Sequence, residues 1–153
     1  MTTSRHTTAT TRLVGRRLSQ TEEAAVCYAA GMKPIDVSET VHAPIESVFA
    51  IISDIPNAAE TIAGINTIHM LTEGPVGMGT KWRETRTFWG KTAEETMWII
   101  DWHPPTRYVV EARSHGTHYL TTIHLEEIGQ HETRVSYSMV AEPETVMSRV
   151  FMV

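Results

Sequence analysis

The segment from Val41 to Asp54 limits the possible folds more than any other part of this 153-residue chain. The residues just before it alternate in polarity, as in a half-buried strand, and after Ala43-Pro44 the apolar residues follow helical spacing. Proline suits the first position of a helix, because its φ angle is fixed and its missing N–H would have no partner there. We therefore expect a strand over 35–41, and a helix over 44–54 directly after it.

The rest of the chain predicts a second short helix and six further strands. The helix is expected over 56–63, with Asn57 able to cap it and Gly64 placed to end it. The strands are expected over 66–72, 80–88, 92–102, 108–114, 118–127 and 133–141. Glycine and proline turns separate them, among them Trp89-Gly90 and Pro104-Pro105. Because the connections are short, these strands should form an antiparallel meander.

Three motifs together resemble the START-like (SRPBCC) superfamily, and within it the polyketide cyclase/dehydrase and lipid transport family. They are the Ala43-Pro44 helix start, the loop GPVGMGTKW from Gly74 to Trp82, and the turn WHPPTR from Trp102 to Arg107. The resemblance extends over roughly residues 33–153. It implies an α+β helix-grip fold with a curved antiparallel sheet of about seven strands and two short helices. In such a fold the sheet wraps a long C-terminal helix, and a ligand cavity lies between the sheet and that helix.

The last helix departs from that family pattern. Val146, Val150 and Phe151 lie on one side of a helix predicted over 143–153, but only about eleven residues remain to form it. At about 1.5 Å per residue this is roughly half the length needed to grip the sheet. We therefore expect a truncated helix, an unusually open cavity, or an apolar groove that a second subunit closes in a homodimer.

The first 31 residues differ in composition from the rest of the chain. Residues 1–20 are rich in threonine, serine and arginine and contain no carboxylate, so they bury too little apolar surface to become ordered. We interpret residues 1–31 as a disordered or dispensable extension and residues 32–153 as one ligand-binding domain. A short helix over 18–30 is compatible with this division. A transit peptide and a functional basic arm are the alternatives.

Charge and cysteine content exclude several classes of function. Residues 1–31 contain four arginines and two glutamates and so carry a charge of +2. Because the net charge of the whole chain is −5, residues 32–153 carry −7. So acidic a domain lacks the basic surface that nucleic acid or anionic lipid requires. No apolar run approaches the ~20 residues that span a bilayer, and the single Cys27 favours a reducing compartment. We therefore expect a cytoplasmic protein without integral membrane association.

Alternation along the strands identifies the side chains that face the expected cavity. Trp82, Glu84, Arg86 and Phe88 share one face of the strand over 80–88, and the two aromatic residues favour the concave side for that face. The inward sets of the later strands include Tyr108, Val110, Tyr119, Thr121 and Tyr137. Tyrosine hydroxyls in an otherwise apolar enclosure suit an amphipathic ligand.

Trp98 and Trp102 are four residues apart and should lie on the same face of the strand over 92–102. Both faces of this strand are partly apolar, so alternation does not decide which of them is the inner one. The two rings are either core packing or a flat aromatic wall for a ring-containing or lipid-like ligand.

The histidines and glycines do not form a metal, nucleotide or hydrolase motif. His118 and His124 share a strand face but stand about 20 Å apart at about 3.3 Å per residue. Gly77-Met78-Gly79 lacks the third glycine and the following helix of a dinucleotide site, and there is no P-loop or serine nucleophile motif. We expect no metal and no cofactor.

Three functions are consistent with these residues. The first, which we favour, is the binding and transport of a small hydrophobic or amphipathic molecule, driven by burial of apolar surface. The second is an enzyme of the cyclase or aromatase kind, as some members of the resembled family are, with Glu84 as general base. Tight pairing of Glu84 with Arg86 would weaken the case for an enzyme, because a paired carboxylate is a poorer base. The third is a protein-interaction module whose groove accepts an apolar segment of a partner.

Overall fold

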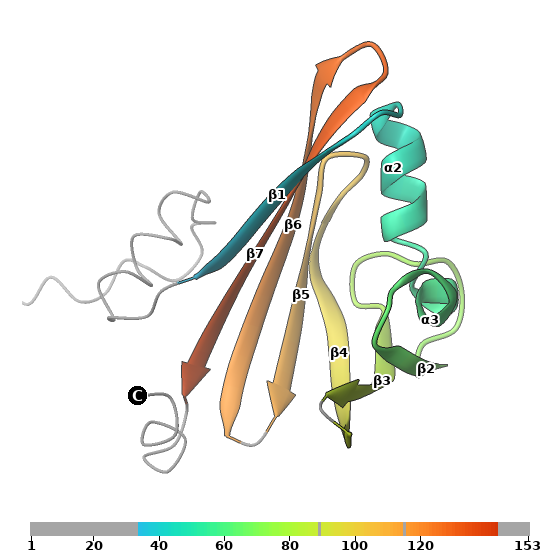
Figure 1. The fold of residues 1–153 in the computed structure, drawn as a ribbon. Helices are drawn as coiled ribbons and strands as arrows, with labels where there is room; N and C mark the ends of the chain where they lie inside the picture. The colour runs from blue at the N-terminus through green and yellow to red at the C-terminus, as the bar shows by residue number, and fades with distance from the viewer. Residues whose placement is uncertain (1–33, 89, 115, 144–153) are drawn as a thin grey trace, which may run out of the picture.

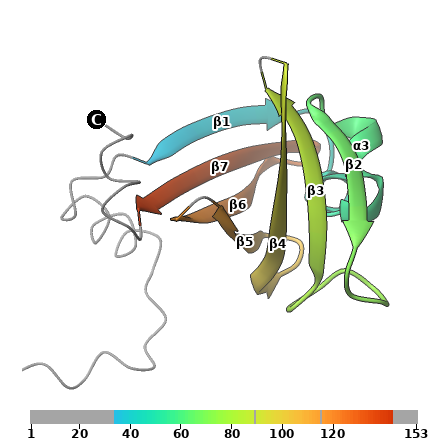
Figure 2. The same cartoon turned by 90° about the horizontal axis from the view of Figure 1, so that it is seen from below.

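The computed structural model of the chain describes residues 34–88, 90–114 and 116–143. One curved antiparallel sheet makes up most of this region, and two short helices lie against one of its faces (Figure 1). Figure 2 shows the curvature of the sheet, which gives it a concave and a convex side.

The chain forms one strand, then the helical segment, then a six-stranded meander. The elements are β1 (Ile35–Val41), α2 (Ile45–Ile52), the 3-10 turn η1 (Ile55–Asn57), α3 (Ala58–Thr61), β2 (Ile65–Met70), β3 (Lys81–Phe88), β4 (Lys91–His103), β5 (Arg107–Ser114), β6 (Thr117–Gly129) and β7 (Glu132–Pro143). The strand order is β1-β7-β6-β5-β4-β3-β2, so the first strand pairs with the last. The predicted seven-stranded antiparallel sheet with two short helices is confirmed.

The start of α2 lies one residue later than predicted. Pro44 is the N-cap, with φ −59° and ψ 147°, and not the first helical residue. At the other end of α2, Ser53 Oγ donates a hydrogen bond to the Phe49 carbonyl. The second predicted helix is divided into η1 and α3. Asn57 is the N-cap of α3, but its side chain donates to the Asp54 carboxylate at 2.9 Å and does not cap the helix.

The hydrophobic core lies between α2 and the concave face of the sheet. Ile45, Val48 and Phe49 of α2 are buried against the strands. The Phe49 ring contacts those of Trp102 and Tyr108 edge-on, with centroids 5.2 and 5.9 Å away. The strand residues buried in the same cluster are Trp82, Ile99, Tyr108, Val110 and Leu125. These contacts confirm that Trp82 faces the concave side, and so do Tyr108 and Val110.

A β-bulge in β4 contradicts one prediction about side-chain faces. Trp98 lies opposite Lys81 on the convex face, where the Lys81 ammonium stands 5.3 Å from the ring centroid. Trp102 lies opposite Tyr108 on the concave face. The two tryptophans therefore do not share a face. The pairing register shifts between Ile99 and Asp101, and the extra residue reverses the alternation beyond it.

The C-terminal prediction is also wrong at its first residue. Pro143 is the last residue of β7, opposite Thr117 of β6, and is therefore a strand residue and not a helical one. The rest of that predicted helix, with its truncation, and the predicted extension over 1–31 lie outside the described residues. In the described part of the chain, no helix is both long enough and apolar enough to cross a membrane.

Candidate functional site

The concave face consists of two parts with very different exposure. The covered part lies under α2, where Ile99 and Leu125 are each 1% exposed. The open part lies on β1, β6 and β7, and we define it by Ile35, Val37, Tyr119, Thr121, Tyr137 and Met139. In it, Ile35 is 56% exposed, Val37 52% and Tyr137 38%. Among the described residues, no helix or loop covers these apolar side chains on the inner side of the sheet.

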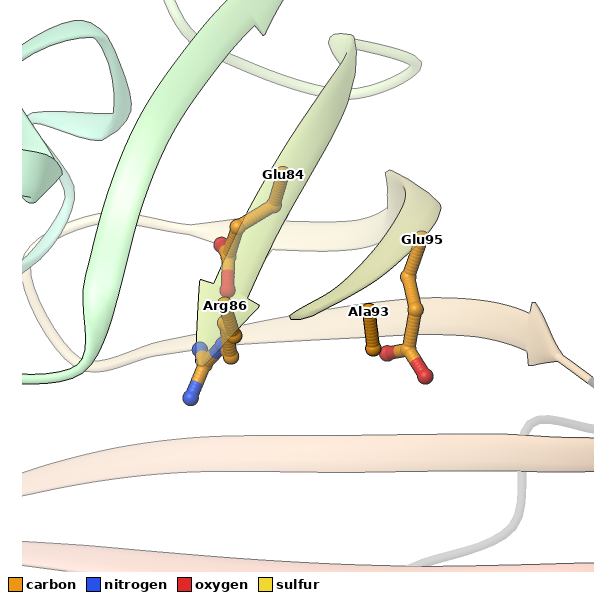
Figure 3. A pocket seen from close by; sticks show the side chains of 4 residues that line it. All are labelled: Glu84, Arg86, Ala93 and Glu95. Atoms are coloured by element: carbon orange, nitrogen blue, oxygen red, sulfur yellow. The ribbon is translucent and has the colours of Figure 1, made fainter. Parts of the chain in front are cut away.

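A shallow hollow that is largely open to solvent, with enclosed room for little more than one water-sized group, lies at one end of the same face, and we call it the polar hollow after its charged side chains. It is lined by Glu84 and Arg86 of β3 and by Ala93 and Glu95 of β4 (Figure 3). Glu84 lies directly opposite Glu95, and Arg86 lies opposite Ala93. All four share the face of the buried Trp82, because they are an even number of residues from Trp82 or from its partner Met97.

Glu84 is deeply buried and its carboxylate is fully engaged. Its side chain is 5% exposed and forms an ion pair through Oε1 with Nε of Arg86. The indole Nε1–H of Trp82 donates to Oε2 at 3.4 Å. A buried carboxylate requires such partners, because its desolvation is otherwise very unfavourable. Two of the residues predicted to share the cavity wall are therefore brought into direct contact.

Glu95 was not predicted, although it lines the hollow. It is partly buried and stands across the hollow from Arg86 in Figure 3. Among the described residues, no side chain forms a hydrogen bond or ion pair with it. The Trp89-Gly90 turn expected from the sequence carried a signal for it, because a two-residue loop there implies pairing of Phe88 with Lys91 and hence of Glu84 with Glu95, which is the register observed.

The predicted tyrosines occupy different environments. The Tyr108 hydroxyl donates to the Ile52 carbonyl at 2.7 Å, and burial, with a smaller effect of nearby Tyr137, raises the pKa of this phenol. Tyr108 therefore joins α2 to the sheet. Tyr137 is exposed, with its hydroxyl 3.5 Å from the Met139 sulfur. Tyr119 lies on the concave face opposite Ala112 and is one of the residues that define the open part.

The remaining predicted ligand-binding residues are divided among three locations. Val110 is buried in the covered part and is 7% exposed. Thr121 lies opposite Val110 and Met139, in the open part. Trp98 lies on the convex face. Phe88 ends β3, and its side chain lies outside the described part of the structure.

Histidine and carboxylate side chains meet on the convex face. There, His118 Nε2 stands 3.0 Å from Glu111 and its Nδ1 stands 3.5 Å from Glu142. Within the described ranges, no group of three or more histidine, cysteine, aspartate or glutamate residues is arranged to hold a metal ion.

Comparison with known proteins identifies the family. A family model described as polyketide cyclase / dehydrase and lipid transport matches residues 32–152. No curated protein matches the sequence. The match agrees with the resemblance carried by the Ala43-Pro44, Gly74–Trp82 and Trp102–Arg107 motifs.

Solved structures with the same fold come from bacteria and plants. An aromatase/cyclase from Streptomyces has a TM-score of 0.66 and 14% identity, over 75% of this chain and 70% of that chain. A START superfamily protein from Mycobacterium smegmatis has a TM-score of 0.64 and 12% identity, over 74% and 79%. Norcoclaurine synthase from Thalictrum flavum, in complex with dopamine and hydroxybenzaldehyde, has a TM-score of 0.63 and 16% identity, over 78% and 74%. At these identities the comparison shows the START-like fold alone.

Proposed function

Because the chain belongs to the polyketide cyclase/dehydrase and lipid transport family, we propose that it binds a small hydrophobic or amphipathic molecule on the concave face of its sheet. The observation that carries this proposal is the exposure of the open part, where Ile35 and Val37 are more than half exposed. Contiguous apolar surface of this kind marks a binding site in a soluble domain.

Burial of apolar surface supplies the driving force. Each Å² removed from water contributes about 25 cal/mol, reduced by the cost of ordering the ligand and the side chains around it. The hydroxyls of Thr121 and Tyr137 and the charges of the polar hollow add polar contacts on the same face. In the sheet only β5 separates β4, which lines the hollow, from β6 of the open part. An amphipathic ligand with an extended apolar body matches this combination.

The contacts of Glu84 favour binding over catalysis. A cyclase activity of the kind considered above requires a carboxylate free to accept a proton from the substrate. Arg86 and Trp82 engage both oxygens of Glu84. An ion pair stabilises the charged carboxylate and makes it a poorer base. We therefore propose a ligand-binding protein in which no covalent step is required.

A pair of charge insertions tests the location of the site. Val37→Asp places a carboxylate in the open part, whereas Ser38→Asp places the same group on the opposite side of the same strand. We expect Val37→Asp to weaken the binding of the fluorescent probe 1-N-phenylnaphthylamine to the full chain by about tenfold or more, since the carboxylate must be desolvated. Ser38→Asp should leave the affinity unchanged.

Native mass spectrometry of the purified full chain provides the complementary measurement. A discrete additional mass that is lost under denaturing conditions supports the proposal. A homodimer that carries no small molecule and does not bind the probe contradicts it, because a second chain then occupies the open part. Equal loss of binding in both variants also contradicts the proposed location.

A further inference from the structure

We propose that the polar hollow selects ligands with a cationic head group, a protonated amine, which Glu95 binds. The inference rests on the ligand-binding function proposed above and specifies the class of ligand. It is an amphiphile with an ammonium group at one end, in preference to a fatty acid or a neutral alcohol.

The charges of Glu84 and Arg86 compensate each other within the protein. The side chain of Glu84 is 5% exposed, and its ion pair with Arg86 and hydrogen bond from Trp82 keep the carboxylate in place. The Arg86 side chain is 34% exposed, and its guanidinium is held by this buried partner. Because the pair is internally neutral, it offers an anionic ligand only a guanidinium whose charge is already balanced.

Glu95 leaves the hollow with an excess negative charge. Its carboxylate is partly buried, and no cation among the described residues pairs with it. Lys91 shares this face but is exposed and lies four residues along β4, about 13 Å away at about 3.3 Å per residue. Glu95 also lies directly opposite Glu84, and like charges in such a cross-strand pair repel each other.

A ligand ammonium group satisfies this arrangement better than other head groups. It supplies N–H donors and a positive charge to the Glu95 carboxylate, which no described side chain pairs with, and charge-assisted hydrogen bonds are the stronger kind. An alcohol donates one neutral hydrogen bond. A carboxylate ligand meets the charge of Glu95 and gains only a guanidinium that already has a partner. The expected order of affinity is therefore amine, then alcohol, then carboxylate.

The neighbouring Glu94 offers a matched control. It lies on the convex face opposite Thr85 and pairs with Arg83 at 3.4 Å. Glu94→Gln and Glu95→Gln remove the same charge from adjacent positions of β4, so any difference between them arises from the face and not from the net charge of the protein.

The experiment measures displacement of 1-N-phenylnaphthylamine from the full chain by decylamine, decanol and decanoate, each below its aggregation concentration, at pH 7 and low salt. Decylamine should bind at least fivefold more tightly than decanol, and decanoate more weakly than either. Glu95→Gln should abolish the preference for the amine while leaving decanol affinity within twofold. Glu94→Gln should retain the preference, and added salt should reduce it.

The outcomes separate this inference from the function on which it rests. If decanol or decanoate binds as tightly as decylamine, or if the Glu95→Gln variant still prefers the amine, the proposed selection of a cationic head group is refuted. The proposed ligand-binding function is unaffected by that result. An equal loss of preference in the Glu94 variant refutes recognition at the hollow. If none of the three amphiphiles displaces the probe, both proposals fail together.

Discussion

The covered and open parts of the concave face are built from similar residues, yet they have opposite exposure. Val110 in the covered part is 7% exposed, whereas Val37 in the open part is 52% exposed. Both point inward from strands of the same sheet. The difference is α2, whose 8 residues extend only about 12 Å. Among the described residues, the reach of this helix determines which apolar side chains become core and which become available to a ligand.

The largest difference between the two parts should appear in the free energy of unfolding. Leu125→Ala leaves a cavity at a position that is 1% exposed and should cost about 3 kcal/mol. Val37→Ala, at a half-exposed position, should cost about 0.5 kcal/mol or less. Urea denaturation of the two full-length variants checks this contrast. Comparable losses would show that the open part is covered in solution.

The polar hollow at one end of the same face should respond asymmetrically to substitution. Arg86→Met leaves the buried Glu84 carboxylate without its cation and should destabilise the protein by about 2–3 kcal/mol. Glu84→Gln should cost less, because the partly exposed Arg86 can turn toward water. The double variant should recover stability relative to Arg86→Met in a double-mutant cycle. Additive losses would mean that the two side chains do not interact in solution.

Tyr108, which joins the helix to the covered part, predicts a dependence on pH. Its pKa is raised by burial, so the folded chain keeps the proton at a pH where the unfolded chain has lost it. The stabilising effect is complete below the ordinary tyrosine pKa of about 10 and declines as the pH rises further. The Tyr108→Phe variant should be about 1 kcal/mol less stable than the wild type at pH 7, because it lacks the hydrogen bond to the Ile52 carbonyl. Above pH 10 its free energy of unfolding should fall less than that of the wild type.

Denaturation at pH 7 and pH 10.5 measures this effect. Tyr137→Phe, at an exposed tyrosine of the open part, is the matched control and should retain most of the wild-type loss of stability at alkaline pH, because Tyr137 is the smaller cause of the raised Tyr108 pKa. If both variants respond alike, the alkaline response does not originate at Tyr108.

The smallest effect is expected on the convex face. Trp98→Phe alters the contact with Lys81 but leaves the concave face untouched, so probe affinity should change by less than twofold. Titration with 1-N-phenylnaphthylamine checks this. A larger change would place part of the ligand outside the concave face.

The strands were predicted to within about two residues, because strict alternation and glycine or proline turns mark them independently of tertiary contacts. The prediction failed in the run Met97 to Trp102, where both faces carry apolar side chains and alternation contains no signal of a bulge. It also failed at Pro143. Proline is common at helix starts, but it is equally compatible with the end of a strand, where the missing N–H has least effect.

The candidate site was predicted as a set of inward-facing residues but not as a set of contacts. Alternation placed Trp82, Glu84 and Arg86 on one face, and the structure adds that Glu84 contacts both of the others. Whether Tyr108 faces a ligand or the helix depends on where Ile52 lies, 56 residues away in sequence. Contacts between distant segments are set by the packing of α2 on the sheet, which no local pattern encodes.

The pairing of β1 with β7 has a consequence for protein synthesis. During translation β1 emerges long before β7, its hydrogen-bonded neighbour in the described sheet. Ile35 of β1 pairs with Met139 of β7, and Val41 pairs with Thr133. Until then the apolar side chains of β1 have no strand beside them, while β2 to β6 can pair in order as they leave the ribosome. The described sheet is therefore completed by β7, the last of its seven strands to leave the ribosome, and a chain released before β7 leaves both β1 and β6 with unpaired edges.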